Sequence, residues 1–201
     1  MIKIISLEGF EYSGKSTQIN LLKRYLKKNK IKSEFKREPG GLKNLEKIRK
    51  VLLNSNLNNQ SLILFFFASR FELLSKINFQ KDKLYIFDRY FDSTYAYQGN
   101  TKSDKNLIKY LIKLIKKELL PNVTFYLDIN NKTLLERKKT RSFQNKFDRI
   151  YSKKFLTIKK NYNELIKTNI GNRKFIKIDA NKSKDQIHTD IVNHLKLCKL
   201  I

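Results

Sequence analysis

The sequence predicts an α/β fold in which a five-stranded parallel sheet has helices on both faces. Two observations support this fold class. First, short apolar runs alternate with longer segments of helical periodicity; the runs span residues 2–7, 33–37, 84–87, 123–127 and 174–178. Second, a glycine-rich segment follows the first run, at the sheet edge where α/β proteins bind ligands beyond the carboxyl ends of their strands.

The glycine-rich segment, residues 8–17, fits the pattern G-x-x-x-x-G-K-[ST] at every fixed position. The glycines let successive backbone N–H groups point at phosphate oxygens, Lys15 adds a positive charge, and Ser16 offers a hydroxyl to Mg²⁺. Residues 18–28 then carry apolar side chains on one helical face. A position between a strand and a helix N-terminus favours a phosphate-binding P-loop over a chance match.

A single domain over residues 1–201 is expected, because this length suits one well-buried α/β core. The first apolar run is too short for a signal peptide, and residues 62–68 fall far short of the roughly twenty apolar residues that cross a bilayer. Cys198 is the single cysteine, which suits a reducing compartment. These features predict a soluble, cytoplasmic protein with no membrane partner.

Lysine dominates the composition and gives a formal net charge of +26. Such a charge can indicate nucleic-acid binding. The lysines are spread along nearly every expected helix, however, and asparagine, isoleucine and phenylalanine are also abundant. This distribution favours a compositional bias, so no nucleic-acid partner is required, although the field would still attract anionic substrates.

Three other segments carry residues suited to nucleotide chemistry. Asp88 follows the third strand, where an acidic residue of a P-loop protein holds Mg²⁺, and Arg89 places a planar donor fork beside it. Residues 37–41 form a rigid Arg-Glu-Pro-Gly-Gly turn at the same edge. Phe66 and Arg70 are four residues apart, so on a helix they share a face that can grip a planar base.

Each of these segments has a plainer interpretation. Asp88 and Arg89 can form a surface ion pair, and the turn can be a simple loop. Phe65 and Phe67, which flank Phe66, are interpreted as core residues.

A cationic run at residues 137–141 precedes polar residues and the sequence Phe147-Asp148-Arg149. Positioned arginines stabilise the charge that develops during phosphoryl transfer, and a mobile segment can supply them when it closes. A solvated charge run is the alternative. Because arginine is scarce in this lysine-rich chain, residues of about 137–150 are predicted to form a lid.

Taken together, the order and spacing of these motifs resemble those of bacterial thymidylate kinases over almost the whole chain. The resemblance implies a P-loop nucleoside monophosphate kinase fold, transfer of a phosphoryl group from Mg-ATP to dTMP, and a homodimer. A deoxynucleoside kinase or another P-loop nucleotide kinase is the alternative. A P-loop switch or ATPase would need a water-positioning residue that is not evident, and a non-enzymatic basic protein would leave the P-loop unexplained.

The resemblance also implies residue roles. The ATP site would contain Gly9, Phe10, Glu11, Tyr12, Ser13, Gly14, Lys15, Ser16 and Thr17, with Ser16 and Asp88 for Mg²⁺. The dTMP site would contain Glu11, Arg37, Pro39, Phe66, Arg70, Arg89, Thr94, Tyr97 and Gln98. The residues expected to act in catalysis are Lys15, Arg89, Arg137, Arg141 and Glu11.

Within the dTMP site, the resemblance implies that Arg89 and Arg37 hold the phosphate. Phe66 would stack on thymine, Arg70 would bond its exocyclic carbonyl, and Tyr97 would crowd the 2′ position of the sugar.

The resemblance further implies the type of enzyme in which a lid arginine assists catalysis, because Tyr12 stands where other members place a P-loop arginine. Two features depart from the family pattern: Tyr151 follows Ile150 where an acidic residue is common, and the lid is longer than expected.

Overall fold

Five parallel strands form the central layer of the protein, and the computed structural model describes residues 1–139, 154–171 and 173–201. The strands run in the order β2-β3-β1-β4-β5. Their bounds are β1 Lys3–Gly9, β2 Ser33–Arg37, β3 Leu84–Asp88, β4 Val123–Asp128 and β5 Lys174–Asp179. The predicted α/β class and all five predicted strands are confirmed, and only the strand ends differ, by one or two residues.

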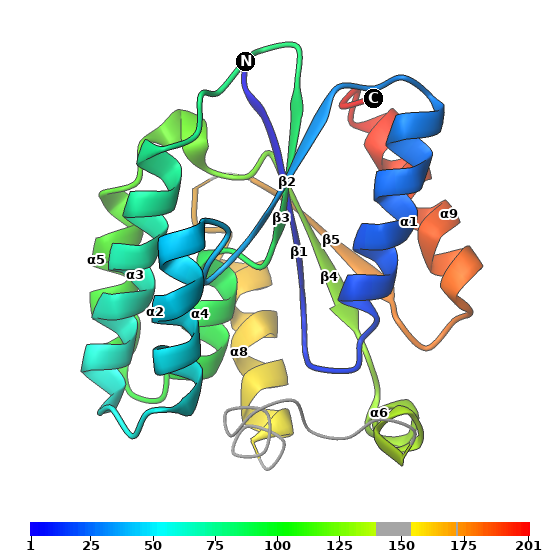
Figure 1. The fold of residues 1–201 in the computed structure, drawn as a ribbon. Coiled ribbons are helices and arrows are strands. Elements are labelled where there is room, and N and C mark those ends of the chain that lie inside the picture. Colours follow the sequence, from blue (N-terminus) through cyan, green and yellow to red (C-terminus); the bar gives the residue numbers. More distant parts are fainter. Residues whose placement is uncertain (140–153, 172) are drawn as a thin grey trace.

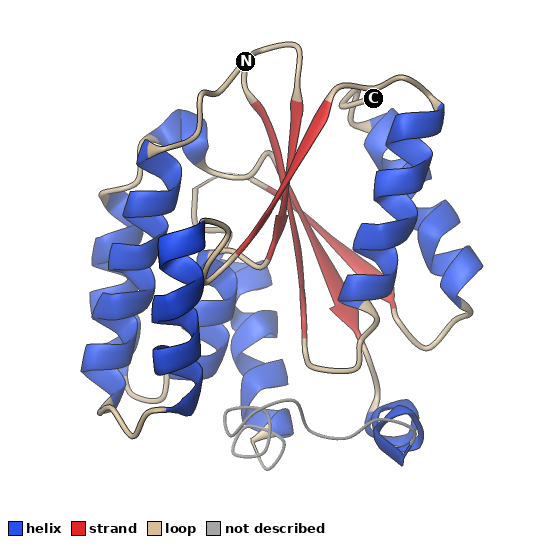
Figure 2. Cartoon of the chain, viewed as in Figure 1, coloured by secondary structure: helices blue, strands red, loops and turns tan. Residues whose placement is uncertain are grey.

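Helices cover both faces of the sheet (Figures 1 and 2). One face carries α1 (Lys15–Lys28) and α9 (Lys184–Leu197). The other side carries α2 (Lys43–Asn54), α3 (Asn59–Ser75), α4 (Phe91–Gln98), α5 (Lys102–Lys113) and α8 (Phe155–Thr168). A short 3₁₀ turn, η1 (Lys117–Leu119), precedes β4, and α6 (Asn131–Lys139) lies beyond the carboxyl end of β4.

The central strand is buried on both faces, which explains its continuous apolar sequence. Ile4, Ile5 and Leu7 are fully buried in β1. The predicted helical face of α1 is also confirmed, because Leu22 and Leu26 pack into the same core. Together these contacts fix the connection between β1 and α1, which is the P-loop.

Helix α3 is apolar on nearly every side, and one of its faces points outward. Phe67 is only 1% exposed, as predicted for a core residue, but Phe65 is 48% exposed. The prediction that Phe65 belongs to the core is therefore wrong. The residue lies on the outer face of α3, next to Leu64, which is also exposed.

The parallel register brings the strand ends together at one edge. Asp88 lies beside both Leu7 and Arg37, and Gly9 lies beside Leu127. The two ends of the chain lie at the opposite edge (Figure 1), where Lys3 Nζ donates a hydrogen bond to the carbonyl oxygen of Leu200 at 3.1 Å. Among the described residues, none of the helices is long and apolar enough to span a membrane.

Candidate active site

The P-loop bends in a way that requires glycine at two positions. Gly9 and Gly14 have φ angles of 145° and 96°. A Cβ atom on Gly9 would lie 2.8 Å from the carbonyl oxygen of Leu127, so a side chain there would clash with β4. The loop therefore lies tightly against the sheet and delivers the N-terminus of α1, with its unpaired N–H groups, to the strand edge.

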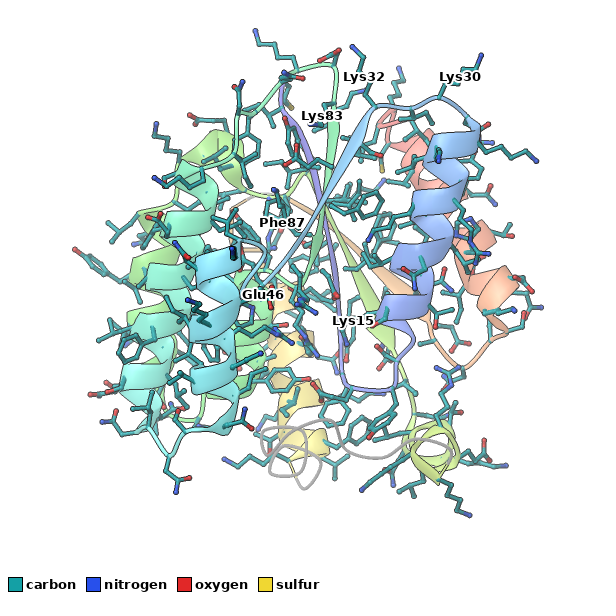
Figure 3. The ribbon with its side chains drawn as sticks, in the orientation of Figure 1. Lys15, Lys30, Lys32, Glu46, Lys83 and Phe87 are labelled. Carbon is teal, nitrogen blue, oxygen red and sulfur yellow. The ribbon has the colours of Figure 1, made fainter. Side chains whose placement is uncertain are left out.

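Lys15 folds back over this loop. Its Nζ atom donates to the carbonyl oxygens of Gly9 and Phe10, each at 2.8 Å. Burial lowers the pKa of the ammonium group to about 8, so the cation remains the main form at neutral pH. Figure 3 shows Lys15 at the start of α1, whereas Lys32 and Lys83 lie near the opposite end of the sheet.

A cavity opens beside the P-loop at the carboxyl ends of the strands, between the β2–α2 connection, α3 and α4. It brings together every residue predicted for the acceptor nucleotide, namely Glu11, Arg37, Pro39, Phe66, Arg70, Arg89, Thr94, Tyr97 and Gln98. The same cavity is lined by Tyr12, Gly14, Lys15, Ser16, Thr17 and Asp88. The predicted acceptor and metal residues therefore share one cavity with six of the nine residues predicted for the ATP site.

Arg89 lines the cavity and makes hydrogen bonds with other segments and side chains of the site. Its Nη1 atom donates to Ser93 Oγ at 2.8 Å and to the carbonyl oxygen of Gly9 at 3.1 Å, and Nη2 donates to Glu11 Oε1 at 2.8 Å. The hydroxyl of Tyr97 donates to the same Glu11 carboxylate at 2.8 Å. This network holds a guanidinium directly beside the P-loop.

Arg70 and Glu38, which also line the cavity, form a buried ion pair. Arg70 Nε donates to Glu38 Oε2 at 2.6 Å, and Nη2 donates to Thr94 Oγ1 at 3.2 Å. Burial raises the pKa of the Glu38 carboxyl to about 7, although Arg70 acts to lower it. Arg70 Nη1 and Glu38 Oε1 are buried without a hydrogen-bond partner among the described residues. The pair therefore leaves one donor atom and one acceptor atom unsatisfied beside the cavity.

Two further arginines enter the cavity from its outer side. Arg37 pairs with Glu46 at 2.7 Å and is half exposed. Arg49 was not predicted; it donates to the carbonyl oxygen of Pro39 at 2.9 Å. Burial, together with repulsion from Arg37 and Arg89, lowers the pKa of Arg49, so this cluster has room for an anion. The signal that could have revealed Arg49 is its spacing, three residues after Glu46 on the same helix.

The donor set at the strand edge fits Mg²⁺. Asp88 ends β3 and, among the described residues, its carboxylate makes no hydrogen bond or ion pair, while Ser16 lies exposed at the start of α1. Within the described ranges, no group of three or more His, Cys, Asp or Glu side chains could hold a metal. One carboxylate and one hydroxyl suit an ion that retains waters and also binds substrate phosphates.

The remaining predicted residues lie apart from the cavity lining. Phe10 packs its ring against Tyr97 and Phe155, and Ser13 is fully buried. Arg137 Nη1 donates to the carbonyl oxygen of Tyr12 at 3.0 Å, and its Nη2 donates to that of Ala180 at 2.7 Å. Arg137 is therefore anchored on the outer side of the P-loop, whereas Arg141 lies outside the described residues, as does most of the predicted lid.

Comparisons with known proteins identify the family of this chain. The family model described as Thymidylate kinase matches residues 7–191. The chain is 35% identical to a thymidylate kinase of Thermosipho africanus, covering 93% of this chain and 94% of the relative, and 36% identical to that of Chlorobium luteolum, covering 96% of each. The crystal structure of thymidylate kinase from Ehrlichia chaffeensis superposes with a TM-score of 0.72 at 28% identity, covering 96% of this chain and 98% of that one.

The family model spans most of the chain, the relatives match it over nearly their full length, and the strand-edge cavity contains the predicted nucleotide residues. The chain therefore belongs to the thymidylate kinase family, whose members phosphorylate dTMP to dTDP.

Proposed function

We propose that the chain transfers the γ-phosphoryl group of Mg-ATP to the 5′-phosphate of dTMP, with both nucleotides meeting at the Gly9 carbonyl. One observation carries this proposal: Lys15 Nζ and Arg89 Nη1 both donate to the carbonyl oxygen of Gly9, at 2.8 and 3.1 Å. Two cations that converge on one atom can hold a donor and an acceptor phosphate close enough for direct transfer.

Lys15 leaves the loop carbonyls to bind the outer phosphates of ATP, and its buried charge stabilises the transferring group. Ser16 and Asp88 supply oxygen ligands for Mg²⁺, which neutralises phosphate charge when it is bound. Arg89, together with Arg49 and Arg37, holds the dTMP phosphate. Phosphoryl transfer needs little covalent chemistry from the protein, so these positioned charges carry the catalysis.

Arg70 and Phe66, which line the same cavity, select the base. The unpaired Nη1 of Arg70 donates to the carbonyl at position 4 of thymine, and Phe66 packs against the ring. Cytosine presents an amino donor at that position, so it would leave Arg70 unsatisfied. Tyr97, which donates to Glu11, crowds the 2′ position of the sugar and so disfavours a 2′-hydroxyl.

The enzyme belongs to the type that uses a lid arginine. Tyr12 leaves the P-loop without a guanidinium of its own, and Arg137 already binds the Tyr12 carbonyl from the end of α6. This contact supports a donor-side role for Arg137 and leaves Arg141 as the second candidate.

The protein acts as a homodimer in the cytoplasm and requires neither nucleic acid nor a membrane. The outward apolar face of α3 supports the dimer, because a helix that is apolar on all sides is normally covered on all sides. The single cysteine supports a reducing compartment.

A coupled assay of ADP release with dTMP, dUMP, dCMP, AMP and thymidine tests the proposed substrate. We expect the highest kcat/KM with dTMP, lower activity with dUMP, and little with dCMP or AMP. Thymidine should not be phosphorylated, because it lacks the anion that Arg89 binds. Turnover of thymidine at a rate comparable to that of dTMP would instead identify a deoxynucleoside kinase.

A further inference from the structure

Glu8 is a buried carboxylate to which the reaction above gives no role. It lies at the end of β1 and is fully buried. Its Oε1 atom accepts from the backbone N–H of Tyr90 at 2.6 Å, and Oε2 accepts from the hydroxyls of Ser93 at 2.6 Å and Tyr162 at 3.0 Å. Burial and the nearby Asp92 raise the pKa of Glu8 to about 7, which shows that a charge is costly at this position.

The first consequence of these contacts concerns the backbone of Arg89. Arg89 has a φ of 70°, in the left-handed region that side-chain-bearing residues disfavour. Its own N–H donates to the carbonyl oxygen of Leu7 at 3.1 Å, and the next N–H, that of Tyr90, donates to Glu8. Both peptide groups that flank Arg89 are therefore hydrogen-bonded to β1, and Glu8 accepts one of these two hydrogen bonds.

The second consequence concerns the guanidinium. Ser93 Oγ donates to Glu8 and accepts from Arg89 Nη1 at 2.8 Å. A hydroxyl has one proton, so giving it to Glu8 keeps the lone pairs of Ser93 directed at Arg89. Glu8 thus acts on Arg89 through the backbone and through a side-chain relay at the same time.

We propose that Glu8 is a positioning residue that aims Arg89 at the acceptor phosphate. The inference rests on the proposed function, in which Arg89 binds the 5′-phosphate of dTMP. Glutamine at position 8 would preserve the shape but replace one acceptor oxygen with a donor NH₂ group. It would then oppose either the Tyr90 N–H or the hydroxyls of Ser93 and Tyr162, and Arg89 would lose its fixed direction.

The test compares dTMP with thymidine, because the two ligands differ only in the phosphate. Dissociation constants are measured by calorimetry for wild-type protein and Glu8→Gln, without ATP. We expect dTMP affinity to fall about tenfold or more while thymidine affinity changes less than about twofold. Ser93→Ala should produce a loss of the same kind, and the double variant should lose no more than the larger single loss, because both changes interrupt one relay.

Glu164→Gln is the matched control. Glu164 on α8 accepts a hydrogen bond from the hydroxyl of Tyr95 on α4 at 2.5 Å. This variant therefore also changes a carboxylate between α4 and α8, but one that does not contact Arg89. Its dTMP-to-thymidine affinity ratio should equal that of the wild type. A loss of the same size in Glu164→Gln, or an equal loss of both ligands in Glu8→Gln, would overturn the inference. If Glu8→Gln does not fold, as judged by circular dichroism, Glu8→Asp is measured in the same way, because it keeps the carboxylate but withdraws it from the Tyr90 N–H and the Ser93 hydroxyl; an unchanged affinity ratio in that variant would overturn the inference.

Arg89→Ala separates the inference from the proposed function. If this variant leaves the affinity ratio unchanged, Arg89 does not bind the phosphate and the proposed role of the site fails. If it lowers the ratio while Glu8→Gln and Ser93→Ala do not, only the positioning role of Glu8 fails.

Discussion

Among single residues, Lys15 has the charge on which ATP binding most directly depends. Its ammonium is present below its pKa and is lost as the pH rises through about 8. We therefore expect kcat/KM for ATP to fall above about pH 8, because the neutral amine cannot offset phosphate charge. A pH profile of initial rates checks this, and Lys15→Met should reduce turnover at least about a hundredfold.

Lys23 provides the control for this profile, because it lies exposed on the same helix. Lys23→Met should retain the wild-type alkaline limb. A wild-type profile that stays flat to about pH 9.5 would contradict the assignment of that limb to Lys15.

Arg70, which we propose recognises the base, also forms the buried ion pair with Glu38. Arg70→Met should raise KM for dTMP at least about tenfold, because it removes the donor aimed at the base. It should also lower the free energy of unfolding by roughly 3 kcal/mol, because it leaves the Glu38 carboxylate buried without its partner. Steady-state kinetics and urea denaturation measure the two effects.

The double variant Arg70→Met/Glu38→Gln separates these effects. Removing both members of the pair should restore much of the lost stability, but KM for dTMP should remain high. Recovery of a normal KM in the double variant would show that Arg70 acts only on the fold.

Among the secondary-structure elements, α6 holds Arg137 against the P-loop, where its Nη1 atom donates to the carbonyl oxygen of Tyr12, and we propose that this arginine acts on the phosphate donor. Arg137→Ala, Arg141→Ala or the double variant should lower the rate of phosphoryl transfer in single turnovers, with little change in dTMP affinity, because the lost interaction belongs to the transition state. Lysine at the responsible position should rescue poorly, since it lacks the planar donor fork. Wild-type transfer rates in all three variants would leave catalysis to Lys15, Arg89 and Mg²⁺.

The elements were largely predictable from the sequence because each depends on a local pattern. Apolar runs located every strand, and the glycines of the P-loop located the turn into α1. Phe65 was assigned wrongly because a helix that is apolar on all sides does not reveal which side faces outward. Glu8 was missed because its partners come from distant segments, and only the register of β1 against β3 brings it to Tyr90. Arg49 was missed because its contact with the carbonyl oxygen of Pro39 depends on how the connection between β2 and α2 folds.

For the whole molecule, the proposed homodimer needs a surface that can bury exposed apolar side chains. The exposed side chains Leu64 and Phe65 on α3 and Val51 on α2 are expected to be buried between two copies. Phe65→Lys should therefore shift the protein from dimer to monomer at micromolar concentration, as measured by light scattering after size exclusion. Leu197→Lys changes a more exposed apolar residue on α9, in the opposite helical layer, and should leave the mass unchanged. A wild-type protein that is already monomeric would contradict the prediction.

The hydrogen bond between Lys3 and Leu200 places the ends of the chain side by side, at the edge of the sheet remote from the P-loop. Neighbouring termini are what circular permutation requires, because a short linker can join them without distorting the core. The two ends of this chain could be joined and the chain reopened at the exposed Lys81–Asp82 turn before β3. The permuted protein would keep its nucleotide site in one piece, with both new ends pointing away from it.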